Sequence, residues 1–94
     1  MTVRYDPQFL KRLKKLDARI RKSFKKRIIL FAHDPHNLQL NNHFLTREYI
    51  NFRSIDITND WRALYTEKNE GDEIVAYFEE IGTHDELYEK FGKN

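Results

Sequence analysis

The chain has 94 residues, of which 39% are hydrophobic and 14% aromatic, which is enough for one hydrophobic core but too few for two domains. It contains no cysteine, so disulfides and thiolate metal sites are excluded, and a reducing cytoplasm is the expected location. With only four histidines and no long apolar run, we expect no metal, no cofactor and no membrane contact.

The formal charge of +2 conceals a separation of charge along the chain. Residues 1–33 sum to +9, residues 34–65 to −1 and residues 66–94 to −6. A basic segment is typical of proteins that contact phosphates, because bound lysine and arginine release condensed counterions. A solvated helix surface gives the same pattern, so charge alone leaves nucleic-acid binding open.

A short strand at the amino terminus is followed by two predicted helices. Asp6 and Pro7 fit the N-cap and first position of the first helix, and Asp17 fits the cap of the second or a joint between them. Apolar residues recur every three or four positions from Phe9 to Phe31, with basic residues between them. This pattern predicts a helical hairpin with one apolar face and a basic outer face.

The second half is predicted to be a loop followed by strands. Residues 37–49 are polar, and their expected anchors to the core are Leu38, Leu40, Phe44 and Leu45. Alternating or β-branched residues predict strands at 52–58, 61–67 and 73–81, separated by turn residues. Gly82 ends the last strand, and a final helical turn is expected from Asp85 to Phe91.

These elements predict an α+β fold in the order β-α-α-β-β-β. The N-terminal helical hairpin would pack on one face of a small antiparallel β-sheet. The other sheet face would stay partly open, so that polar side chains of the strands are exposed there.

Four short motifs follow one another along the predicted elements. In Leu40–Leu45 a histidine precedes an apolar anchor, and Phe52–Ile57 has the pattern of a central strand. Asn59–Tyr65 combines aspartate, an aromatic residue, arginine and tyrosine, and the tail joins Gly82-Thr83-His84 to Leu87-Tyr88. Over nearly the whole chain these motifs resemble the RelE/ParE superfamily of toxin–antitoxin toxins, and the tail is most similar to its YafQ-like branch.

The resemblance implies one toxin domain over residues 1–94, held inactive by a cognate antitoxin protein. In the YafQ-like and RelE-like branches the freed toxin is an mRNA interferase, an endoribonuclease that cuts mRNA in the ribosomal A site. In the ParE branch, which shares the fold, the toxin inhibits DNA gyrase and has no nuclease chemistry. Fold alone does not separate these activities.

Metal-free RNA cleavage needs a base, an acid and a positive group that stabilises the phosphorane. At His84 the resemblance implies an acid or base, against the alternative of a cap for the tail. Asp60 matches a residue that orients a histidine or acts as a base, and otherwise reads as a turn residue. His43 matches a loop histidine that contacts substrate or shuttles a proton, and otherwise reads as a solvated side chain.

Arg62 is the candidate for the positive catalytic group, and the remaining candidates are expected to bind substrate. Arg62 and Arg53 lie on adjacent strands and are expected either to clamp a phosphate or to pair with an acid of the last third. Tyr88 is expected to stack on a base or to plug the core, as Leu87 does, and Trp61 to pack at the sheet. The basic residues expected to contact ribosomal RNA are Lys11, Lys14, Lys15, Arg21, Lys22 and Lys25.

The chain departs from the YafQ-like pattern at Asp56, where that branch usually carries a histidine on the central strand. A carboxylate replaces an imidazole as a base, but as an acid near neutral pH only if its pKa is raised. Three hypotheses for the function therefore remain. The chain is a ribosome-dependent nuclease, or a ParE-like gyrase inhibitor, or an inactive relative or non-toxic binding module.

Overall fold

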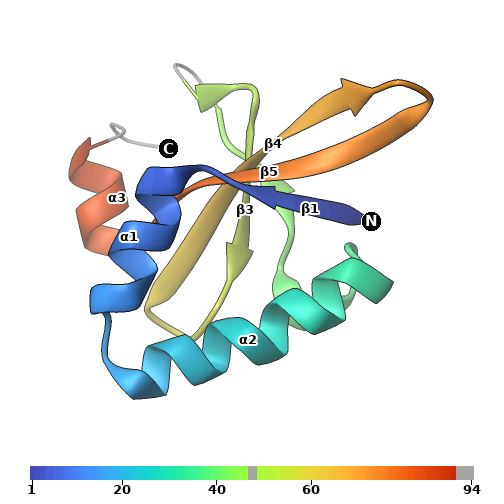
Figure 1. Cartoon of the computed structure of the whole chain (residues 1–94). Coiled ribbons are helices and arrows are strands. Elements are labelled where there is room, and N and C mark those ends of the chain that lie inside the picture. Colours follow the sequence, from blue (N-terminus) through green and yellow to red (C-terminus); the bar gives the residue numbers. More distant parts are fainter. Residues whose placement is uncertain (47–48, 91–94) are drawn as a thin grey trace.

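The computed structural model describes residues 1–46 and 49–90, and Figure 1 shows their arrangement. The elements in chain order are β1 (Thr2–Tyr5), α1 (Pro7–Lys15), α2 (Ala18–His33), the 3₁₀ helix η1 (Leu38–Leu40), β2 (His43–Phe44), β3 (Phe52–Asp56), β4 (Trp61–Glu70), β5 (Glu73–Thr83) and α3 (His84–Lys90). The last helix confirms the expected helical turn as far as Lys90, and Phe91 lies outside the described residues.

The strands form one sheet in the order β1-β5-β4-β3-β2. The predicted α+β class is confirmed, but the sheet is mixed, since β1 runs parallel to β5 while the other pairs are antiparallel. The two helices cross one face of the sheet and carry the chain from β1, at one edge, to β2, at the other edge (Figure 1). As a result, β1 pairs with the last strand, β5, and not with β3.

Both predicted helix starts are confirmed. The Asp6 carboxylate accepts a hydrogen bond from the Gln8 amide at 2.8 Å, and the Asp17 carboxylate accepts one from the Arg19 amide at 2.7 Å. Each cap satisfies a backbone donor that the first turn of a helix leaves unpaired. The bend between α1 and α2 therefore lies at the second cap, and it lets both helices cover the same sheet face.

The core lies between these helices and β4 and β5, and it is largely aromatic. Phe78 of β5 is fully buried and stacks edge-on against Phe31 of α2, with ring centroids 5.3 Å apart. Leu40 of η1 is also fully buried, as expected of a loop anchor. The same prediction was wrong for Leu38, which is 95% exposed because the single turn of η1 directs it away from the core. It was also wrong for Phe44, which is 54% exposed and has its ring covered by the Arg53 guanidinium instead of by the core.

The opposite face of the sheet carries Asp56 of β3 and Arg62 of β4. Ile55 is buried in the core, so its neighbour Asp56 points to the other side of β3. In the antiparallel register Asp56 lies opposite Arg62, and Arg62 lies opposite Gly82 of β5. This row leads directly to the start of α3. No helix in the described part of the chain is long and apolar enough to cross a membrane.

Candidate functional site

The β3–β4 turn and the start of α3 meet at one end of the sheet. The Thr58 hydroxyl accepts hydrogen bonds from the amides of Asp60 at 3.2 Å and Trp61 at 3.1 Å, which fixes the turn from within. The Asp60 carbonyl then accepts a hydrogen bond from the His84 amide at 2.8 Å. Two residues that are 24 positions apart in the sequence are thereby held side by side through their backbones.

A capping box fixes the first turn of α3. The Thr83 hydroxyl accepts from the Glu86 amide at 3.1 Å, and the Glu86 carboxylate accepts from the Thr83 amide at 2.9 Å. Arg12 of α1 donates to the same carboxylate at 2.9 Å and to the Ile81 carbonyl at 2.7 Å. A Cβ at Gly82 would lie 3.3 Å from Leu87, so the glycine lets α3 pack closely.

Removal of the Glu86 carboxylate should loosen this helix start. We expect Glu86→Ala to lower stability by about 1 kcal/mol, as for other lost caps, and the melting temperature by roughly 4–8 °C. The hydrogen bond from the Thr83 amide, aided by Arg12, lowers the pKa of Glu86 below its ordinary value of 4.5. The stabilisation of the fold by the Glu86 carboxylate is therefore fully present above pH 4.5 and is lost as the pH falls through the lowered pKa of Glu86.

Thermal unfolding of Glu86→Ala and of the wild type between pH 7 and pH 3 checks this expectation. The difference in melting temperature should shrink as the pH falls. A difference that stays constant would mean that the ionised carboxylate is not what fixes α3.

His84 and Tyr88 form the exposed surface of α3 next to the turn. The His84 side chain is 56% exposed, and its ring stacks on Tyr88 with centroids 5.5 Å apart and planes 29° from parallel. The Asp85 carboxylate lies 3.7 Å from Nδ1 of His84. The imidazole is thus open to a large partner and oriented by an aromatic neighbour on the same helix.

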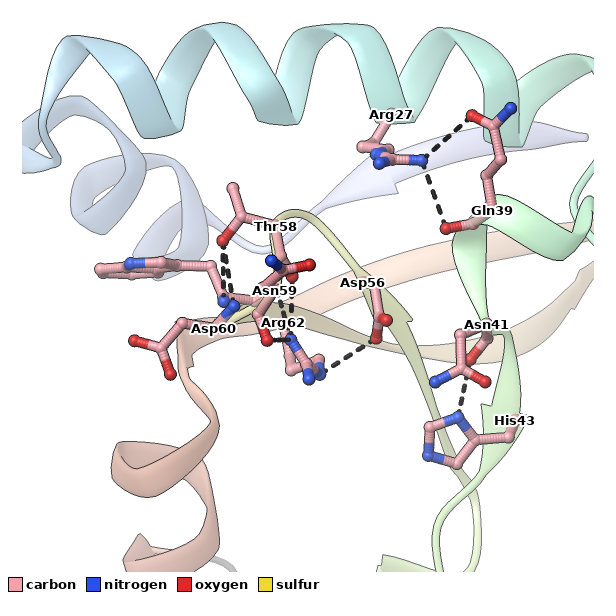
Figure 2. A network of polar contacts seen from close by, with 10 residues as sticks. Arg27, Gln39, Asn41, His43, Asp56, Thr58, Asn59, Asp60 and Arg62 are labelled. Carbon is pink, nitrogen blue, oxygen red and sulfur yellow. Dashed lines mark hydrogen bonds and ion pairs between the residues drawn. The ribbon is translucent and has the colours of Figure 1, made fainter.

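His43 lies on the same sheet face as Asp56, because it is paired with Ser54, two residues earlier on β3. Its Nδ1 lies 2.7 Å from the Asn41 carbonyl, and Figure 2 shows this contact. A carbonyl only accepts, so Nδ1 carries the proton, and Nε2 of a neutral ring keeps its lone pair. The side chain is exposed, which leaves Nε2 accessible to a proton donor.

Arg62 is engaged in four contacts with the protein. Its Nε lies 3.0 Å from Oδ1 of Asp56, and its Nη1 donates to three carbonyls of the turn at 3.0–3.1 Å. These carbonyls belong to Thr58, Asn59 and Trp61. In Figure 2 the guanidinium lies between Asp56 and the turn. The expected ion pair is therefore present, but the acid comes from β3 and not from the last third of the chain.

Arg53 does not share a face with Arg62. It is paired across the strands with Tyr65, which is buried in the core, while Asp56 and Arg62 lie on the opposite side. Its guanidinium donates to the Asn42 side chain at 3.1 Å, lies 3.6 Å from the Glu67 carboxylate and covers the Phe44 ring. The two arginines thus do not form one phosphate clamp, and Arg53 has the acid partner expected by the alternative interpretation.

The sequence of nearly the whole chain matches that of a known protein family. The model of the YafQ family, described as bacterial toxins of type II toxin–antitoxin systems, matches residues 1–89. The chain belongs to the YafQ toxin family. No curated protein matches its sequence.

Solved structures share the fold of this YafQ-family toxin. YafQ from E. coli strain BL21(DE3) has 22% identity and a TM-score of 0.72, covering 92% of this chain and 96% of its own. The YoeB/ParE toxin from Agrobacterium tumefaciens has 17% identity and a TM-score of 0.71, covering 89% and 99%. The E. coli DinJ–YafQ complex has 21% identity and a TM-score of 0.60, covering 92% and 96%.

The basic residues of this toxin that were expected to contact RNA lie along α1 and α2. All six that were expected to contact RNA are exposed: Lys11, Lys14, Lys15, Arg21, Lys22 and Lys25. Arg21 also donates to the carbonyls of Lys14 at 3.3 Å and Leu16 at 2.8 Å, so it caps the end of α1. Among the described residues, no group of three or more histidine or acidic side chains is placed to hold a metal ion.

Three residues that shape the site were not among the sequence candidates of this YafQ-family toxin. Thr83 and Glu86 have the spacing of a capping box, so their pairing was readable from local sequence. Arg12 carried no such signal, because its partner Glu86 is 74 positions away and its neighbours are equally basic. Leu87 and Trp61 pack as expected, the former buried and the latter against the core.

Proposed function

We propose that this YafQ-family toxin is a ribosome-dependent endoribonuclease that cuts mRNA by acid–base catalysis without a metal. The observation that supports this best is the 2.8 Å hydrogen bond from the His84 amide to the Asp60 carbonyl. It holds together the two residues that match the family's tail and hairpin motifs. Both side chains are exposed, as contact with mRNA bound to a ribosome requires.

The proposed chemistry needs two proton transfers. A base removes the proton of the ribose 2′-OH, whose oxygen attacks the phosphorus, and an acid protonates the departing 5′ oxygen. We assign the acid to His84, with the Asp60 carboxylate orienting it, and the base to Nε2 of His43, which keeps its lone pair. Tyr88, which stacks on His84, would hold an unpaired base against the imidazole.

Two kinds of partner follow from this proposal. The exposed lysines of α1 and α2 would bind ribosomal RNA, since such binding is mainly electrostatic. A cognate antitoxin would cover the toxin in the resting cell, as the E. coli DinJ–YafQ complex suggests for a protein of the same fold. An acidic, partly disordered segment would complement the charge of residues 1–33.

One observation favours a second function, inhibition of DNA gyrase without nuclease chemistry. Asp56 stands where the branch usually has a histidine. Its carboxylate is paired with Arg62 and so does not take over the catalytic role of that histidine. A toxin that acts by binding alone would not need that imidazole.

Expression of the chain from a tightly controlled promoter separates the two functions. We expect growth arrest accompanied by cleaved transcripts, while purified gyrase keeps its supercoiling activity in the presence of the protein. Arrest with intact transcripts and inhibited gyrase would replace the nuclease assignment by the second function. Soluble protein without arrest would mean that the chain is an inactive relative.

A further inference from the structure

The ion pair of Asp56 and Arg62 is largely buried in the surface of the sheet. The two side chains are 25% and 19% exposed, and Oδ1 of Asp56, which faces Nε of Arg62, is buried. This oxygen receives no aligned hydrogen bond from the described residues, so charge attraction to the guanidinium is what compensates its burial. A pair in this state is costly to separate, which makes the position of Arg62 well defined.

The same guanidinium, from Arg62 of β4, contacts both Asp56 of β3 and the β3–β4 turn. While Nε faces Asp56, Nη1 donates to the carbonyls of Thr58, Asn59 and Trp61. Asp60 belongs to that turn, and its own carbonyl accepts the His84 amide. A continuous path of polar contacts therefore runs from Asp56 through Arg62 and the turn to α3 (Figure 2 shows its first part).

We propose that Asp56 and Arg62 are a pair of positioning residues that fix the distance between Asp60 and His84. In this chain, the position that usually carries a histidine on the central strand then serves alignment and not proton transfer. Arg62 acts through the turn and does not bind the scissile phosphate. The inference rests on the proposed nuclease function for its kinetic part only, since the geometry of the turn is measurable in a protein without activity.

Asp56→Asn is the decisive variant, because the two possible roles of Arg62 predict opposite results. If the pair positions the turn, loss of the carboxylate releases Arg62, and kcat for mRNA cleavage on programmed ribosomes should fall about 10- to 100-fold with little change in KM. If Arg62 bound the phosphate directly, its release from Asp56 would leave cleavage unchanged or raise it.

Amide hydrogen exchange at His84 gives the second measurement. Because this amide donates to the Asp60 carbonyl, we expect its exchange in Asp56→Asn to be about tenfold faster than in the wild type. Asp56→Glu keeps the charge and should recover part of both properties. Glu70→Gln is the matched control, since it removes an exposed ion pair with Arg4 that lies away from the turn, and should change neither.

Each outcome then decides the proposal. Lower kcat together with faster exchange supports it, whereas unchanged exchange overturns it whether cleavage is lower, unchanged or higher. If the wild type cuts no mRNA, the nuclease function fails, and faster exchange in Asp56→Asn still supports positioning while unchanged exchange overturns it. If Asp56→Asn does not fold, Arg62→Lys replaces it, since lysine keeps the charge but not the four contacts.

Discussion

Replacement of His84 by alanine should lower the rate of mRNA cleavage by about 10²–10⁴-fold, the usual contribution of a general acid or base. The side chain is more than half exposed, and its ring contacts are with Tyr88 and Asp85 at the surface. Its loss should therefore change the free energy of unfolding by only about 0.5 kcal/mol. The measurement is cleavage of a defined mRNA on purified ribosomes, together with a thermal unfolding curve.

His36→Ala is the control for this substitution. His36 is also exposed, and nothing in the sequence or the structure gives it a role, so cleavage and growth arrest should persist. If His84→Ala still arrested growth while transcripts stayed intact, the toxin would act by binding. If the variant cut mRNA at the wild-type rate, the acid would have to be another group, and the match of the tail to the family would concern structure alone.

The parts of the fold that were predictable depend on neighbours in sequence. Asp6 and Asp17 cap their helices through contacts with amides two residues ahead, so the local sequence is enough to predict where each helix begins. Leu38 and Leu40 are both leucines of the same polar loop, and they differ only in whether the single turn of η1 points the side chain towards the core or away from it. A polar loop without periodicity contains no information on that direction.

Sequence motifs proposed a set of candidate site residues but not their arrangement. They pointed to His84, Asp60 and His43 as candidates, whereas the hydrogen bond from the His84 amide to the Asp60 carbonyl depends on tertiary packing. The role of Arg62 was open for the same reason. Its partner became visible only with the strand register, which sets Asp56 directly opposite and leaves Arg53 on the other face.

The site also depends on a strand that is held from the opposite face of the sheet. Phe78 is fully buried in β5, six residues before His84, and the same strand ends at Thr83, directly before His84. Five aromatic rings have centroids 5.0–6.4 Å from that of Phe78. They belong to Tyr5, Phe9, Phe24, Phe31 and Tyr65. This one ring therefore joins both helices, β1 and β4 to the strand that carries the site.

Phe78→Ala should cost about 3–5 kcal/mol of stability, because it removes buried surface and leaves a cavity between two helices and the sheet. Small domains are stable by only about 5–15 kcal/mol, so the melting temperature should fall by roughly 15 °C or more. Cleavage should decrease with the folded fraction and return on cooling, unlike the loss in His84→Ala, which is present at every temperature. Phe78→Leu fills most of the volume and should stay close to the wild type. Unfolding curves that differ by only a few degrees would mean that the aromatic cluster relaxes around the missing ring, and that α1 and α2 hold β5 without it.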